Sequence, residues 1–249
     1  MPELFISQLL NDEELKCVID RTGCGLELID FSMASVLDDL DAQLGLWQER
    51  LEVLRPPHLS VHGAFLDLNP TSWERFVADA TMLRFNQSYQ AAKVLGAERV
   101  TYHSCFVPNF NFLEGWAPRV IDFYERFLED KDYSIHILME NVMDPVPEAF
   151  AEVAEGISHP AFGICLDIGH AHCYSDVSVR KWLEDLAPWI RHLHIHDNDG
   201  KRDSHLALGD GTIGFEEMAG LVPKDAAFTV ECSRKDYVMK SVQNLQEWL

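Results

Sequence analysis

Eight short apolar segments, separated by longer amphipathic stretches, limit the folds open to this chain more than any other feature. We read them as strands, at Glu3–Ser7, Gly25–Asp30, His58–His62, Arg99–His103, Ser134–Glu140, Phe162–Asp167, Ile190–His196 and Ala227–Glu231. Strands that alternate with helices pair in parallel through right-handed crossovers. Eight such units in 249 residues predict an α/β fold with one closed (β/α)8 barrel.

Helical patterns fill the stretches between the strands, near Asp12–Thr22, Val36–Val53, Ser72–Leu95, Leu113–Glu129, Pro147–Glu155, Ser178–Leu186, Phe215–Leu221 and Lys235–Leu249. No linker or low-complexity segment divides them, so residues 1–249 are expected to form a single TIM-barrel domain. An open doubly wound sheet is the structural alternative, but it typically carries a glycine-rich phosphate-binding turn after an early strand. The sequence contains neither G-x-G-x-x-G nor a Walker loop.

The chain is strongly acidic, with 41 Asp and Glu against 20 Lys and Arg and a formal net charge of −21. Long-range repulsion argues against duplex DNA as a partner. No run approaches the ~18 apolar residues of a membrane span, and the N-terminus lacks a signal-peptide pattern, so no membrane partner is expected. Six scattered cysteines without a C-x-x-C pair favour reduced thiols and a cytoplasmic location. The sequence marks no subunit interface, so an oligomer stays open.

Ionisable residues gather where consecutive strands end. The third to eighth strands end at or just before His62, His103, Glu140, Asp167 and His170, His194 and His196, and Glu231. In a parallel barrel these ends meet at one face, where active sites are built. Burying such groups without partners costs free energy, whereas imidazoles and carboxylates together bind zinc, manganese and related ions. We therefore expect a divalent metal site at the C-terminal mouth.

The long loop after the seventh strand, DNDGKRDSHLALGDGTIG, adds two more candidate ligands, Asp203 and His205, in D-x-H spacing. Its glycines and polar residues are typical of a surface loop that can fold over the mouth. Lys201 and Arg202 in this loop are candidates for binding a substrate phosphate, and a solvated loop tip is an equally good interpretation.

The remaining histidines and cysteines are expected to be structural. A single histidine at a strand end is more often a satisfied polar residue than a ligand, so joint placement carries the metal hypothesis. No role is expected for His136, His159, His172 and His192, and His58 opens a strand at the opposite end of the barrel. Alternation along the strands is expected to turn three cysteines away from the mouth as core fillers, namely Cys105, Cys165 and Cys232.

The motifs at these positions resemble the xylose isomerase-like superfamily of barrels, which contains sugar isomerases and epimerases as well as endonuclease IV. The matching pattern is M-E-N, D-x-G-H, H-x-H-D, D-x-H-x-x-L-G-D-G and V-E-C, and the resemblance spans nearly the whole chain. The mononuclear isomerases and epimerases of this superfamily hold one ion with residues of their last four strands. The resemblance implies that the corresponding residues here are Glu140, Asp167, His194 and Glu231.

Endonuclease IV-like members hold three zinc ions with a larger set of ligands, and the resemblance implies a counterpart here for each of them. By this resemblance, one ion would be held by His62, His103 and Glu140, a second by Glu140, Asp167, His194 and Glu231, and a third by His170, Asp203 and His205.

The chain also departs from endonuclease IV-like proteins. His196 stands where they usually carry Asn, and Asp210 where a Glu is common. The loop DFSMASVLDDLD lacks the basic and aromatic residues that wedge a DNA stack in those enzymes. These differences leave the metal residues in place and argue against a DNA substrate.

Two chemistries are consistent with these residues. The first is isomerisation or epimerisation of a small sugar or sugar phosphate, with Glu140 and Glu231 moving the proton and with His196, Lys201 and Arg202 binding the substrate. The second is hydrolysis of a small phosphoester by a multinuclear site, which the number of candidate ligands favours. The missing wedge loop and the acidic charge place the isomerase or epimerase first. Either enzyme would use zinc or manganese, one to three ions per chain. A binding protein without chemistry is disfavoured because both glutamates are present.

Overall fold

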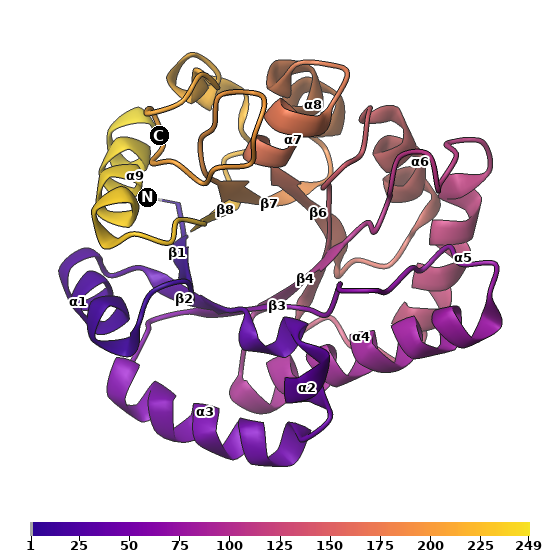
Figure 1. Ribbon diagram of the computed structural model, residues 1–249, viewed down its shortest axis with the longest axis horizontal. Coiled ribbons are helices and arrows are strands. Elements are labelled where there is room, and N and C mark those ends of the chain that lie inside the picture. Colours follow the sequence, from indigo (N-terminus) through magenta and orange to yellow (C-terminus); the bar gives the residue numbers. More distant parts are fainter. Residues whose placement is uncertain (1) are drawn as a thin grey trace.

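The computed structural model describes residues 2–249, and its strands close into a barrel in sequence order, with all neighbouring strands parallel. The strands are β1 (Leu4–Ser7), β2 (Gly25–Leu28), β3 (Leu59–His62), β4 (Arg99–His103), β5 (His136–Glu140), β6 (Phe162–Asp167), β7 (Ile190–Ile195) and β8 (Ala227–Val230). Figure 1 shows them around a common centre with the helices outside. The predicted (β/α)8 barrel is confirmed.

The helices form the outer layer, and two of them, α1 and α9, pack beside each other next to the chain ends. They are α1 (Asp12–Thr22), α2 (Ala34–Leu37), α3 (Leu40–Leu54), α4 (Arg75–Leu95), α5 (Trp116–Leu128), α6 (Glu148–Gly156), α7 (Ile168–Tyr174), α8 (Val179–Leu186) and α9 (Lys235–Trp248). Of the helices the structure describes, none is both long and apolar enough to cross a membrane.

The helices of the structure differ from the predicted ones at several places. The stretch 36–53 is interrupted between α2 and α3, because Asp39 has φ −123° and ψ 47°, outside the helical region. The stretch 215–221 forms two short 3-10 turns, η2 (Phe215–Glu217) and η3 (Ala219–Leu221), since Gly220 and Pro223 disfavour a longer helix. The short helix α7, directly after β6, was not predicted.

The wall between β3, β4 and α4 is packed closely around an aromatic core. Tyr102 on β4 stacks on Phe85 of α4 with ring centroids 4.0 Å apart, and its hydroxyl donates to the Phe85 carbonyl oxygen at 2.7 Å. A Cβ atom on Gly63 would lie 2.2 Å from the Tyr102 ring. Only glycine therefore fits directly after His62, where β3 ends.

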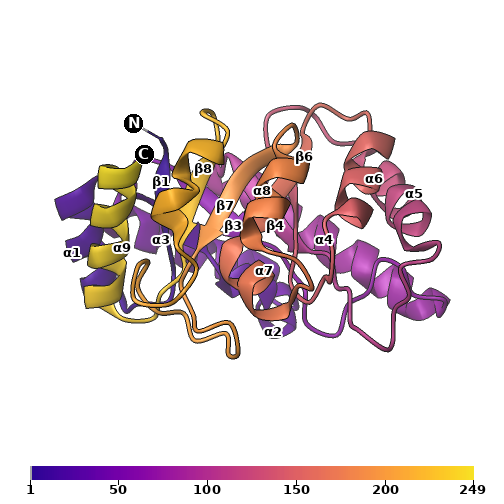
Figure 2. The same ribbon diagram turned by 90° about the horizontal axis from the view of Figure 1, so that it is seen from above.

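The chain termini and the long loop after β7 lie at opposite ends of the barrel (Figure 2). In Figure 2 both chain termini lie on one side, and the long loop after β7 projects from the opposite side, beside α7. That opposite side is the C-terminal end of the strands, where the candidate ligands lie.

Candidate metal centre

Glu140, the last residue of β5, is surrounded by histidines from four other segments. Its Oε2 atom lies 3.4 Å from His62 Nε2 and 3.6 Å from His103 Nε2. Its Oε1 atom lies 3.4 Å from His170 Nδ1 and 3.2 Å from His194 Nδ1. The structure therefore brings these five predicted ligands together at the C-terminal mouth.

Two further carboxylates border this group. His194 Nδ1 is 3.3 Å from Glu231 Oε1, and His170 Nδ1 is 3.3 Å from Asp167 Oδ2. Both Asp167 and Glu231 are buried. The four residues expected to hold a single ion thus meet at the ends of the last four strands, with Glu231 directly after β8.

A third group lies beside the first two, where the loop after β7 brings Asp203 and His205 against His170 and His196. Asp203 Oδ2 is 3.3 Å from His170 Nε2 and 3.4 Å from His205 Nε2, and Asp203 Oδ1 is 3.4 Å from His196 Nδ1. The rings of His196 and His205 stack with centroids 3.8 Å apart and an interplanar angle of 8°. Donor atoms of these four residues lie within 4.8 Å of one another.

The register of the barrel explains why residues so far apart in sequence meet. Glu140 stands opposite His103 on β4 and Cys165 on β6, and Asp167 stands opposite His194 on β7. Residues paired across parallel strands project from the same side of the sheet. Interior positions at the ends of neighbouring strands therefore face one shared space.

The D-x-G-H motif performs two structural tasks after β6. The Asp167 side chain caps α7 by accepting the His170 backbone N–H at 2.7 Å, and the first turn of α7 then carries the His170 ring back over the mouth. A Cβ atom on Gly169 would lie 2.0 Å from the His196 ring. The glycine therefore makes room for His196.

Three histidines present one particular nitrogen to the centre. The Nδ1 atoms of His62 and His170 lie 3.0 Å from the backbone oxygens of Gly63 and Asn141, and His205 Nδ1 lies 2.6 Å from that of Glu231. A carbonyl oxygen only accepts, so each Nδ1 donates its hydrogen, and Nε2 is the nitrogen that offers a lone pair to a cation once the ring is neutral. Metal-binding histidines are typically fixed in this way.

The distances in the cluster fit divalent cations. Two ligand atoms about 2.1 Å from one ion at a tetrahedral angle are ~3.4 Å apart, whereas N–H···O bonds are about 2.7–3.2 Å long. The contacts of Glu140 with His62 Nε2, His103 Nε2 and His194 Nδ1, at 3.2 to 3.6 Å, match the separation of ligands.

Buried polar atoms without hydrogen-bond partners also indicate that the cluster suits a divalent cation. Within residues 2–249, the buried atoms without a hydrogen-bond partner include both carboxylate oxygens of Glu140, both ring nitrogens of His194, His196 Nδ1 and Asp203 Oδ1. Buried polar atoms without partners cost free energy, and a bound cation would relieve that cost.

The two glutamates of the centre have pKa values shifted in opposite directions. Burial opposes ionisation of Glu140, but the imidazoles of His194 and His103 outweigh burial and hold the pKa of Glu140 well below its ordinary value. Burial raises the pKa of Glu231, and the nearby His194 offsets this only in part. In the cation-free protein, Glu231 therefore takes up a proton more readily than Glu140.

The pKa values of two histidines of the cluster are also shifted in opposite directions. Burial lowers the pKa of His103 to about 3. Burial acts in the same direction on His205, but the hydrogen bond with Asp203 and the charge of Glu231 raise the pKa of His205 to about 9. His205 must lose its proton to ligate a cation, so cation affinity at the third group should increase with pH up to about 9.

The three residues expected to bind substrate are placed differently. His196 is fully buried, facing Asp167 at 3.1 Å as well as Asp203. Lys201 and Arg202 are exposed, and their backbone amides donate to Asp199 Oδ1 at 3.0 and 3.1 Å. Their roles toward a substrate stay predictions.

Three interior residues were assigned no site role from the sequence. Glu27 on β2 and His192 on β7 are completely buried, with atoms close to His194. Cys165 was expected to point away from the mouth, which is wrong, because its Sγ lies close to Glu140 and His194. Cys165 precedes Asp167 by two residues, so both project from the same side of β6.

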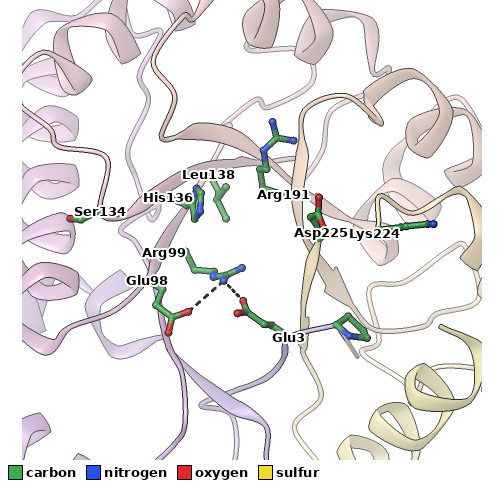
Figure 3. A pocket seen from close by; sticks show the side chains of 11 residues that line it. Glu3, Glu98, Arg99, Ser134, His136, Leu138, Arg191, Lys224 and Asp225 are labelled. Atoms are coloured by element: carbon green, nitrogen blue, oxygen red, sulfur yellow. Dashed lines mark hydrogen bonds and ion pairs between the residues drawn. The ribbon is translucent and has the colours of Figure 1, made fainter.

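A cavity of about 460 Å³ lies away from this cluster, at the opposite end of the barrel. Figure 3 shows Arg99 in it, paired with Glu3 at 2.5 Å and with Glu98 at 3.6 Å. Its lining also includes His136 and Arg191, and contains no candidate metal ligand.

Known proteins resemble the chain over nearly its full length. Residues 25–248 match the family model described as xylose isomerase-like TIM barrel. An uncharacterised protein of Methanocaldococcus jannaschii is 29% identical over 218 residues, covering 81% of this chain and 72% of that protein.

Two solved structures are similar as well. A D-tagatose 3-epimerase-like protein is 25% identical with a TM-score of 0.80, covering 99% of this chain and 96% of the other. A Thermus thermophilus protein, from crystals soaked with zinc chloride, is 26% identical with a TM-score of 0.78, covering 99% and 97%.

Proposed function

The chain belongs to the xylose isomerase-like TIM barrel family, and from this premise we propose that it is a divalent-metal-dependent isomerase or epimerase of a small sugar or sugar phosphate. One observation carries the proposal. Glu140 and Glu231 flank the same nitrogen of His194, at 3.2 and 3.3 Å, at the C-terminal mouth of the barrel. Two such carboxylates can remove a proton from one position of a sugar and return a proton at another.

The residues of the chain have separate tasks in this reaction. A divalent ion, when bound, supplies a Lewis acid that stabilises negative charge on the substrate oxygens. Glu140, Asp167, His194 and Glu231 would hold it. One of the two glutamates removes the proton beside the substrate carbonyl, and the other returns a proton to the neighbouring carbon or to the opposite face.

The similar proteins support both parts of the proposal. One is described as D-tagatose 3-epimerase-like, and the other was studied after soaking with zinc chloride. Imidazoles mixed with carboxylates suit zinc or manganese. We also propose that Lys201 and Arg202 contact a substrate phosphate. The six cysteines, all free in the described residues, support a cytoplasmic location.

The decisive experiment measures exchange of substrate hydrogen with solvent. The protein, loaded with zinc or manganese, is incubated in D2O with a panel of ketoses and their phosphates, and NMR detects deuterium at carbon and the new isomers. We expect Glu140→Gln and Glu231→Gln to abolish turnover, and Glu155→Gln, at an exposed position of α6, to leave it unchanged. Unchanged turnover in both of the first two variants would refute the assignment.

The number of converging ligands favours a second candidate function. All nine residues implied by the endonuclease IV-like pattern lie in the cluster, including Asp203 and His205, which a one-ion isomerase does not need. We propose as the alternative a trinuclear phosphoester hydrolase for a small substrate, since the net charge of −21 opposes duplex DNA.

His205→Ala separates the two functions. In a trinuclear hydrolase it should remove one ion, whereas a one-ion isomerase should keep the ion that Glu140, Asp167, His194 and Glu231 hold. A hydrolase should then lose most of its phosphate release, whereas an isomerase should be only mildly impaired. Elemental analysis that finds about one tightly bound ion in the unmodified protein would contradict the trinuclear alternative.

A further inference from the structure

Glu27 lies in the barrel interior and touches the metal centre through His194 alone among the nine candidate ligands. It is a middle residue of β2 and is completely buried. Its Oε2 atom accepts hydrogen bonds from Ser60 Oγ at 2.8 Å and from Thr229 Oγ1 at 3.0 Å. Its Oε1 atom lies 3.2 Å from His194 Nε2. Within residues 2–249, neither Oε1 nor that nitrogen has a hydrogen-bond partner, although the two atoms face each other.

The hydrogen bonds around Glu27 have a defined direction. Arg99 Nη1 lies 3.3 Å from His192 Nδ1, and a guanidinium can only donate, so His192 Nδ1 accepts. The Nε2–H of His192 then donates to Thr229 Oγ1 at 2.7 Å. The Thr229 hydroxyl in turn has its own hydrogen free for Glu27. Oε2 is thereby held by two hydroxyl donors.

This arrangement leaves Oε1 of Glu27 for one partner. A carboxylate accepts and does not donate, so the nitrogen that faces it carries the hydrogen. His194 therefore presents Nε2–H to Glu27, and the lone pair of Nδ1 points between Glu140 and Glu231, at 3.2 and 3.3 Å. The opposite tautomer would point a hydrogen at both carboxylates of the centre.

We propose that Glu27 is a positioning residue that fixes the ring orientation and tautomer of His194 for cation binding through Nδ1. The inference rests on the metal centre of the proposed function. A buried carboxylate held by two hydroxyl donors and facing a histidine costs desolvation that an apolar side chain would avoid. Carboxylates that accept from the second nitrogen of a ligand histidine typically change metal affinity by about 10–100-fold.

The chain of contacts continues below Glu27 to the far end of the barrel. Arg99, which begins it, also pairs with Glu3 in the cavity of Figure 3. The two terminal nitrogens of the Arg99 guanidinium contact different partners, Nη2 donating to Glu3 and Nη1 to His192. The orientation of His194 is therefore supported by residues of the strands and not by the loops of the mouth.

Zinc binding and nitrogen NMR test the proposal. Zinc affinity is measured by competition with a chelator for the unmodified protein, Glu27→Gln, Thr229→Val and Ser60→Ala. The Gln amide can donate to His194 Nε2 and so favours the wrong tautomer; we expect zinc affinity about 10–100-fold weaker. Thr229→Val and Ser60→Ala keep the charge of Glu27 and should weaken zinc binding less, by about threefold, as expected for one lost hydrogen bond.

NMR of 15N-histidine-labelled, zinc-loaded protein reads the tautomer directly. His194, assigned by comparison with His194→Asn, should show a hydrogen on Nε2 and zinc on Nδ1. Zinc on Nε2 in the unmodified protein would overturn the proposal, whether or not Glu27→Gln folds. Equal zinc affinity in Glu27→Gln and the unmodified protein would overturn it too, while leaving the proposed function standing. An unmodified protein that binds no zinc or manganese would end both.

Discussion

Asp144 is a buried carboxyl group outside the metal centre, and its surroundings predict how the stability of the protein depends on pH. Its Oδ2 atom accepts from Ser104 Oγ at 2.7 Å and from the Val142 backbone N–H at 2.9 Å. Burial nevertheless raises the pKa of Asp144 from 3.8 to about 7. The folded protein thus holds this proton more tightly than the unfolded chain. The contribution of Asp144 to stability is therefore fully present below pH 4 and is lost as the pH rises to about 7.

Asp144→Asn should remove this pH dependence, because an amide oxygen can accept the same two hydrogen bonds. Relative to the unmodified protein, the free energy of unfolding of the variant should increase between pH 5 and pH 8 by about 2 to 3 kcal/mol, at about 1.4 kcal/mol per pKa unit. Urea unfolding at both pH values measures it, with the exposed Asp79→Asn as the control. A difference that does not change with pH would contradict the prediction.

Some residues of the centre were predictable because of where they stand in the strands. Glu140 and His194 lie near strand ends, where parallel strands share one face. Glu27 lies one layer lower, inside the strand GLEL, where an apolar residue is usual. A charged residue there was a signal, but its partners, such as Thr229, come from strands whose register a sequence does not give.

At the scale of elements, the short helix α7 shows what local patterns do not reveal. Its 7 residues are too few for a helical periodicity, and its start depends on Asp167 as a cap. The loop after β7 is similar, since His205 has φ 45°, and the contact between Asp197 and Leu206 holds the loop in place. A local cap decides where α7 begins, whereas tertiary contacts, which the sequence does not display, decide the conformation of the loop.

We predict that replacing glycine by alanine has opposite effects on stability at two helical positions. Gly169→Ala in α7 would place a methyl group 2.0 Å from the ring of His196, which Asp167 and His205 hold in place. We expect a loss of about 1 to 3 kcal/mol. Gly45→Ala in α3 meets no atom within 4 Å and should gain about 0.5–1 kcal/mol from helix propensity. Thermal unfolding compares the two, and a Gly169→Ala variant as stable as Gly45→Ala would contradict the packing.

For the whole molecule, cation binding and folding should be linked. The interior concentrates carboxylates in a chain whose net charge is already −21. Repulsion between these charges is expected to destabilise the cation-free protein. We expect treatment with a chelator to lower the melting temperature and added zinc to restore it. At a zinc concentration 100 times the Kd, binding contributes about 2.7 kcal/mol.

The same titration has an internal control. Glu140→Gln should show a much smaller zinc-dependent increase in melting temperature than the unmodified protein, because Glu140 contacts four of the candidate ligands. An increase of equal size in both proteins would place zinc elsewhere on the molecule.

Anomalous diffraction from crystals grown with zinc tests the central claim most directly, because it locates the ions. The account predicts a strong peak within about 2.3 Å of ligand atoms from Glu140, Asp167, His194 and Glu231, with His194 Nδ1 toward the ion. Zinc bound only at other sites, with these four residues making no contact to an ion, would contradict it.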